Sequence, residues 1–155
     1  QPVTGSAGEL VELAQRCELP LMADESLLTL EDAKTLAAAG DRVWWNIRIS
    51  KNGGPLQALR LARLAAEKNI PFTVGCMVGE TSILSALQRI VLQMAPRPRF
   101  VEGNYGRLLL SDDLTARSLR FGYGGRLRAL LDLNTVAPQT GKLARYGELV
   151  DSSIS

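Results

Sequence analysis

The sequence predicts an α/β fold made of about four successive βα units of a parallel barrel. Short apolar segments begin near residues 20, 43, 72 and 99, and a segment with helical periodicity follows each of the first three. The intervals leave room for the helix that returns the chain along a parallel sheet. Charged residues follow the apolar segments, at the strand end where a barrel carries its active site.

The composition is that of a folded protein with limited catalytic options. The chain has 155 residues, of which 46% are hydrophobic and 22% charged, enough for a buried core. Its 18 Lys and Arg oppose 16 Asp and Glu, and a net charge of +2 gives no reason to expect nucleic acid as a partner. The chain has no histidine, which excludes histidine-based catalysis and histidine-bearing zinc sites. Acid–base chemistry therefore falls to carboxylates, Lys, Arg, Tyr or Cys.

The chain carries no feature of a membrane or secreted protein. No apolar run approaches the roughly 20 residues that span a bilayer, and the first residues lack the charged and apolar regions of a signal peptide. Cys17 and Cys76 lie far apart in sequence, which favours free thiols, with a disulfide as the alternative. We expect a cytoplasmic protein. Because it opens on Gln1 rather than Met, we also expect it to be processed, trimmed or cut from a longer chain.

The first βα unit is preceded by a helix. Residues 8–17 place apolar side chains on one helical stripe, and residues 20–23 form a short strand. Thr29 is a good N-cap for the next helix, which runs to Ala39. Gly40 supplies the residue that ends this helix.

The later units follow the same order. Residues 43–49 form the second strand, and the next helix, over 55–68, starts on a proline. The third strand covers 72–77 and is followed by an amphipathic helix over 83–94, which two prolines end. Residues 99–101 begin a short fourth strand.

We expect two parts along the chain. Residues 1–103 carry the four strands and their helices. Residues 104–155 are rich in Gly and Arg and have no clear periodicity, so we interpret them as a C-terminal loop and capping tail.

The second strand indicates a barrel rather than an open sheet. Side chains alternate between the two faces of a strand, so the apolar residues of 43–49 share one face while Asn46 and Arg48 share the other. A doubly wound sheet is buried on both faces, and its strands are apolar throughout. A barrel strand instead has an apolar outer face and ends in functional side chains.

Charged residues mark the ends of all four strands: Asp24 and Glu25, then Arg48, then Glu80, then Glu102. The carboxyl ends of parallel strands meet at one edge of a sheet. We therefore expect these residues to converge on a single rim.

Three of these strand ends carry motifs that occur together in a known family. They are Leu-Met-Ala-Asp-Glu-Ser at 21–26, Asn-Ile-Arg-Ile-Ser-Lys-Asn-Gly-Gly at 46–54 and Gly-Cys-Met-Val-Gly-Glu-Thr-Ser at 75–82. In this order and spacing the chain resembles the enolase superfamily, most closely its mandelate racemase/muconate lactonizing branch, which includes the dipeptide epimerases. The resemblance covers residues 1–103 and implies strands five to eight of a (β/α)7β barrel.

The resemblance implies an Mg²⁺-dependent enzyme, an isomerase, cycloisomerase or lyase, that removes a proton α to a carboxylate. Asp24 matches a metal ligand, and the acid/base lysine of the family falls at Arg48. A guanidinium is a poor base, so we expect Arg48 to bind a carboxylate or stabilise an enolate, which disfavours two-base racemisation. Glu25 is expected to orient Arg48 rather than bind metal. The alternative for Arg48 is an ion pair inside the barrel with Asp24 or Glu25. Lys51 is a less favoured substitute base, because alternation places it on the opposite face from Arg48.

Further residues are candidates for substrate binding. Glu80, Thr81 and Ser82 follow the third strand, although Thr81 or Ser82 is also a natural helix N-cap. Glu102 matches the position of acids that bind a substrate ammonium in dipeptide epimerases. Gly53 and its neighbour form either a tight turn or a backbone cradle for an anion.

The resemblance places two further metal ligands, a Lys-x-Lys base motif and a capping domain upstream of Gln1. One carboxylate makes a weak Mg²⁺ site, so Mg²⁺ is expected to need those upstream carboxylates and the 155-residue chain alone to be inactive. A half barrel has two uncovered edges, which predicts a homo-oligomer or association with the missing half. The expected partner is a small carboxylate substrate, without nucleic acid or membrane. The alternative is a non-catalytic enolase-like domain with a binding or structural role.

Overall fold

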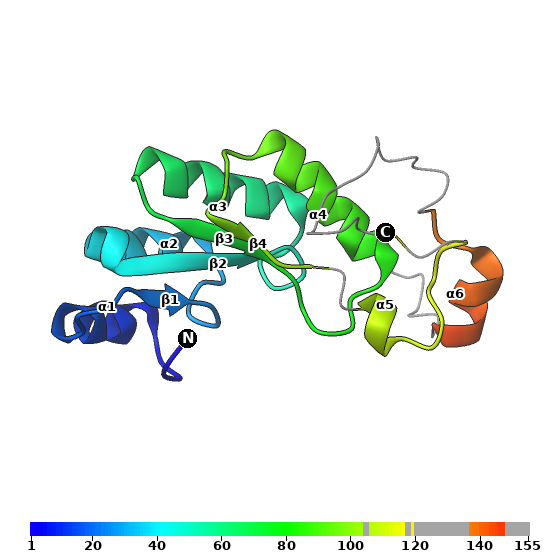
Figure 1. Cartoon of the computed structure of the whole chain (residues 1–155), viewed down its shortest axis with the longest axis horizontal. Coiled ribbons are helices and arrows are strands. Elements are labelled where there is room, and N and C mark those ends of the chain that lie inside the picture. Colours follow the sequence, from blue (N-terminus) through cyan, green and yellow to red (C-terminus); the bar gives the residue numbers. More distant parts are fainter. Residues whose placement is uncertain (104–105, 117–118, 120–136, 148–155) are drawn as a thin grey trace, which may run out of the picture. The chain divides into compact units, whose positions relative to one another are not determined.

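A computed structural model describes residues 1–103, 106–116, 119 and 137–147. One parallel sheet is formed in the order β1-β2-β3-β4, and each strand pairs with the next strand along the chain (Figure 1). The strands are β1 Leu21–Ala23, β2 Val43–Arg48, β3 Phe72–Gly75 and β4 Phe100–Val101. The predicted α/β fold with a parallel sheet is confirmed.

Helices connect the strands, as the spacing predicts. They are α1 Ala7–Arg16, α2 Leu30–Leu36, the 3₁₀-helix η1 Ala37–Arg42, α3 Pro55–Glu67 and α4 Ser82–Met94. Thr29 is the N-cap of α2, and its hydroxyl and the carboxylate of Asp32 satisfy each other's backbone N–H groups in a capping box. The helix predicted to run to Ala39 instead tightens into η1 after Leu36, and Gly40 turns the chain at φ 56°.

The two faces of β2 have different surroundings. Val43, Trp45 and Ile47 are fully buried on the face that alternation predicts to be apolar, and α1 and α3 both contact β2. Trp44 lies on the other face, where its ring stacks on Phe100 with 6.3 Å between centroids. The core of this part of the chain therefore lies between the sheet and its helices.

The described chain divides into two compact units. The first comprises residues 1–77 and 87–103, and the second comprises 78–86 together with the chain after residue 103. The second unit contains α5 Gly106–Leu109 and α6 Thr140–Tyr146, which the sequence did not predict because their four and seven residues are too few to show a helical period. The predicted division at residue 103 stays a prediction.

Two further expectations concern the surroundings of the protein. Cys17 and Cys76 are both free thiols, as predicted. In the part of the chain that the structure describes, no helix has the length and apolar character needed to cross a bilayer.

Candidate functional site at the strand ends

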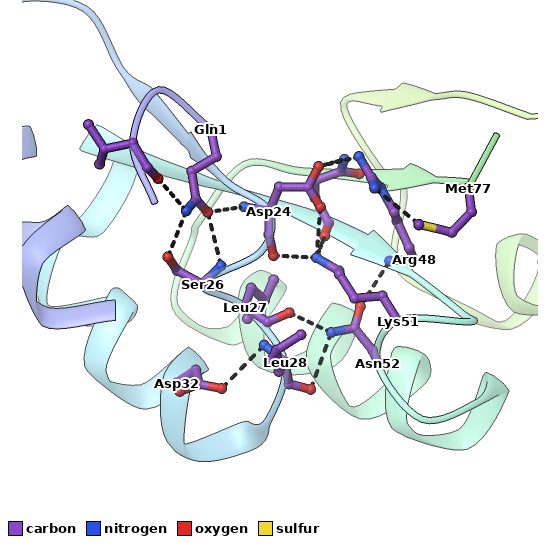
Figure 2. Close-up of polar contacts among 12 residues, drawn as sticks. Gln1, Asp24, Ser26, Leu27, Leu28, Asp32, Arg48, Lys51, Asn52 and Met77 are labelled. Atoms are coloured by element: carbon purple, nitrogen blue, oxygen red, sulfur yellow. Dashed lines mark hydrogen bonds and ion pairs between the residues drawn. The ribbon is translucent and has the colours of Figure 1, made fainter. Parts of the chain in front are cut away.

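The carboxyl ends of β1 and β2 bring two predicted site residues together. Asp24 directly follows β1, and Arg48 is the last residue of β2 (Figure 2). The guanidinium Nη2 of Arg48 donates a hydrogen bond to Oδ2 of Asp24 and forms an ion pair with it. Only 9% of the Asp24 side chain and 19% of the Arg48 side chain are exposed to solvent. The structure therefore contains the Asp24–Arg48 ion pair expected as the alternative role of Arg48.

Lys51 joins the same carboxylate. Its Nζ donates to Oδ1 of Asp24 at 2.9 Å, to the carbonyl oxygen of Asp24, and to the carbonyl oxygen of Asn46 at 3.0 Å. The expectation that Lys51 faces away from Arg48 is wrong, because β2 ends at Arg48 and the chain then turns, with Asn52 N–H donating to the carbonyl of Arg48 at 2.9 Å. Strand alternation does not continue through a turn. Burial lowers the pKa of Lys51, while the hydrogen bond and charge of Asp24 oppose that shift.

Asn46 completes the set of donors around Asp24. Its Nδ2 donates to Oδ2 of Asp24 at 3.1 Å, and the residue is 4% exposed. Its Oδ1 occupies the space in which a side chain on Gly75 would lie, across the β2–β3 pairing. Glycine is needed at position 75 for this close approach rather than for an unusual backbone conformation.

Replacing Gly75 by Ala is expected to lower the free energy of unfolding by about 1 to 3 kcal/mol, because the new methyl group overlaps the Asn46 amide. The amide must move, and its bond to Asp24 is lost. Urea denaturation measures the change. The matched control is Gly141→Ala in α6, where no atom lies within 4 Å of the new methyl group, so stability is unchanged or slightly higher. A neutral Gly75→Ala variant would contradict this packing.

The turn after β2 supports the strand ends through the side chain of Asn52. The side chain of Asn52 accepts a hydrogen bond from Arg48 N–H at 2.9 Å and donates to the carbonyls of Leu27 at 2.7 Å and Leu28 at 3.3 Å. Gly53 and Gly54 follow with φ of 79° and 101°, which residues with a side chain rarely adopt. These positive φ values support the tight turn as the role of the glycine pair.

Gln1 holds the loop after β1. Its Oε1 accepts hydrogen bonds from the backbone N–H groups of Asp24 and Ser26, both at 2.9 Å, and its Nε2 donates to the Ser26 hydroxyl at 2.9 Å (Figure 2). Sequence reasoning missed both Gln1 and Asn52 as supports of the site. Most of their partners are backbone groups 23 to 25 residues away in sequence, and no residue pattern signals such contacts.

Glu25 and Glu102 lie at strand ends but are exposed. Among the described residues neither carboxylate makes a hydrogen bond or an ion pair, and Glu25 acts on Lys51 only through its charge, which raises the pKa of that lysine. The backbone of Glu102 is fixed by Gln88 of α4, whose Nε2 donates to its carbonyl and, at 3.2 Å, to the carbonyl of Gly75. The predicted roles of both glutamates stay predictions.

Glu80, Thr81 and Ser82 belong to the second unit. The Ser82 N–H donates to both carboxylate oxygens of Asp113 at 3.2 Å, and its buried hydroxyl donates to Asp113 and accepts from Leu119 N–H at 2.7 Å. The carbonyl of Thr81 accepts from Ser85 N–H at 3.2 Å, as at the start of a helix. These contacts support the helix-start alternative for Thr81 and Ser82, and substrate contact stays a prediction.

The described residues by themselves do not fit a magnesium site. Within them, no three His, Cys, Asp or Glu side chains gather closely enough to hold a metal ion. Mg²⁺ prefers six oxygen ligands in octahedral geometry, usually with carboxylates among them. Asp24 is one carboxylate, and both of its oxygens already accept hydrogen bonds from Arg48, Asn46 or Lys51.

Comparisons with known proteins identify the family of this chain. Residues 1–129 match the enolase C-terminal domain-like family. Muconate cycloisomerase 1 from Pseudomonas putida is 44% identical over 68 residues, which cover 44% of this chain and 18% of that enzyme. A muconate lactonizing enzyme of known structure superposes with a TM-score of 0.72 at 29% identity, covering 92% of this chain and 39% of the other.

A second solved structure comes from the epimerases. It is a dipeptide epimerase from Cytophaga hutchinsonii, complexed with Mg and the dipeptide D-Ala-L-Val, with a TM-score of 0.65, 25% identity, and coverage of 77% of this chain and 32% of that one. The chain thus spans less than two fifths of the length of each of these relatives. This chain belongs to the enolase superfamily, in its mandelate racemase/muconate lactonizing branch.

Proposed function

We propose that these residues are the C-terminal part of the barrel of an isomerase, cycloisomerase or lyase that acts at the carbon α to a carboxylate of a small substrate. Family membership and the muconate- and dipeptide-acting relatives support this class. The observation that carries it is the guanidinium of Arg48, held at the rim by Asp24. Because a guanidinium stays protonated, Arg48 is not itself a base, which favours one-base chemistry over two-base racemisation.

Arg48 is prepared to bind an oxyanion. Asp24 fixes one end of the guanidinium, and Nη1 at the other end donates to the sulfur of Met77 at 3.2 Å. A thioether is a weak acceptor, so a carboxylate or enolate oxygen would replace it with a stronger, charge-assisted bond. In this proposal Arg48 stabilises negative charge as it develops on the substrate, and Asp24 sets its orientation.

The other strand-end residues take secondary roles. Glu25 adds negative charge beside Lys51, and Glu102 is exposed at the end of β4, where a substrate ammonium could reach it. Glu80, Thr81 and Ser82 follow β3 and are kept as substrate-binding candidates. Each role is proposed from its place at a strand end.

Magnesium and the general base require chain beyond these 155 residues. Mg²⁺, when bound, supplies positive charge that stabilises an enediolate. In the complete protein Asp24 would be one of its ligands, and further carboxylates would come from outside this chain. The 155-residue chain alone is therefore expected to be inactive.

The edges of the sheet need a partner. Within the described sheet β1 and β4 each pair on one side only. Unpaired strand edges associate readily. We propose that the remaining barrel half or a second copy of the chain covers them, and that the protein acts in the cytoplasm.

Replacing Arg48 by Ala in the complete protein is expected to lower turnover at least tenfold, which corresponds to about 1.4 kcal/mol of barrier. Exchange of the substrate α-proton in D₂O, followed by NMR over a panel of muconate, hydroxy acids and dipeptides, identifies the substrate and measures the rate. Arg63→Ala, at an exposed position of α3, is the matched control. Unchanged kinetics in Arg48→Ala would reject the role of Arg48.

A second candidate function is a non-catalytic enolase-like binding domain. The buried ion pair between Asp24 and Arg48 favours it, because the carboxylate at the metal-ligand position is bound by a basic side chain of the chain itself. Two results together would support this candidate. The complete protein would exchange no substrate α-proton across the panel, and its upstream sequence would lack the two carboxylate ligands and the Lys-x-Lys motif.

A further inference from the structure

Both carboxylate oxygens of Asp24 accept hydrogen bonds from groups of this chain. Oδ2 accepts from Arg48 and, at 3.1 Å, from Asn46, while Oδ1 accepts from Lys51 at 2.9 Å. We propose that Arg48 and Lys51 compete with a divalent cation for Asp24, so that the rim formed by this chain carries its own cations and does not take up metal. The inference rests on the proposed function only in treating Asp24 as the metal-ligand position.

The charges at the rim already balance. Asp24 and Glu25 are acidic, and Arg48 and Lys51 are basic, so the four charges sum to zero. A divalent cation at Asp24 would add two positive charges beside a guanidinium and an ammonium whose side chains are only 19% and 10% exposed. Like charges repel strongly where water is largely excluded.

The guanidinium of Arg48 has no second acceptor as strong as Asp24 among the described residues. Within the part of the chain that the structure describes, its only other side-chain hydrogen bond is to the sulfur of Met77, and its Nε is buried without a hydrogen-bond partner. Releasing Asp24 to a metal would leave a mostly buried guanidinium unpaired, which is costly. Within this chain alone, where no further carboxylates help to hold a metal, the planar fork of the arginine therefore keeps the carboxylate.

Replacing Arg48 and Lys51 by neutral residues should make the carboxylate of Asp24 available to a metal ion. Asp24 would then offer its freed carboxylate oxygens to a hard cation, with the negative charge of Glu25 nearby. Wild-type chain should bind Mn²⁺ no more tightly than Asp24→Asn. The double variant Arg48→Gln/Lys51→Gln should bind Mn²⁺ at least tenfold more tightly than wild type, and adding Asp24→Asn should abolish the gain.

Electron paramagnetic resonance of free Mn²⁺ measures these affinities on the 155-residue chain, with Arg63→Gln as the matched control. Circular dichroism checks folding, and if the double variant unfolds, Arg48→Gln alone takes its place with the same expected direction. The inference would be overturned if the wild-type chain bound Mn²⁺ and Asp24→Asn abolished that binding. It would also be overturned if the Arg48→Gln/Lys51→Gln variant were folded but bound Mn²⁺ no more tightly than wild type. Because this readout is metal affinity rather than turnover, it is separate from the α-proton exchange that tests the proposed function.

Discussion

Replacing Asp24 by Asn is expected to lower the free energy of unfolding of this chain by about 3 kcal/mol. The substitution keeps the shape of the side chain but removes the negative charge that Arg48 and Lys51 share. Both cations then remain mostly buried, with side chains 19% and 10% exposed, and without their charged partner. Breaking a buried pair from one side costs more than the pair itself contributes, since the remaining charge is left uncompensated.

Urea denaturation measures this loss, with Asp41→Asn at an exposed position as the control. Adding Arg48→Gln to Asp24→Asn should recover part of the stability, because the variant then has one unpaired cation fewer. A loss below about 0.5 kcal/mol, as for ordinary surface substitutions, would show that Asp24 does not neutralise the two cations in solution.

Replacing Trp45 by Ala is expected to cost about 3 to 5 kcal/mol, the range for truncating a large aromatic residue in a core. Trp45 is 0% exposed on the face of β2 that is buried with the helices, and its Nε1 has no hydrogen-bond partner among the described residues. The loss is therefore one of packing and buried apolar surface alone. The surrounding sheet and helices cannot close a cavity of that size without moving.

Trp44→Ala is the matched comparison, one residue away on the other face. Trp44 is half-buried, its ring stacks on that of Phe100, and the guanidinium of Arg99 lies 5.9 Å from the centre of its ring. Its truncation should cost about 1 kcal/mol. Equal losses in the two variants, measured by urea denaturation, would contradict the assignment of Trp45 to the helix-covered face.

The strands and the meeting of Asp24 with Arg48 could be predicted because each depends on a regular pattern. Apolar segments separated by helical ones predict a parallel sheet, and parallel strands end at the same edge. Thr29 was predictable as an N-cap for a similar reason, since its hydroxyl satisfies a backbone donor close by in sequence. In each case the physical rule acts either locally or through a periodic geometry.

Lys51, Gln1 and Asn52 could not be placed in this way. Lys51 lies three residues past the end of β2, where the turn rather than the pleat decides the direction of the side chain. Gln1 and Asn52 bind backbone groups that lie 23 to 25 residues away in sequence. Such contacts depend on how the loops pack in three dimensions, and composition and spacing carry no trace of that packing.

The contacts of Asn52 affect which substitutions the turn after β2 tolerates. Asn52 contacts only main-chain atoms of Arg48, Leu27 and Leu28, so these hydrogen bonds require backbone N–H and C=O groups rather than one particular side chain at those positions. The support of this turn is therefore separate from the chemistry of the side chain at the strand end. A substitution at position 48, proline excepted, keeps the N–H group from which Asn52 accepts, so the side chain displayed at this strand end can change while the turn stays supported.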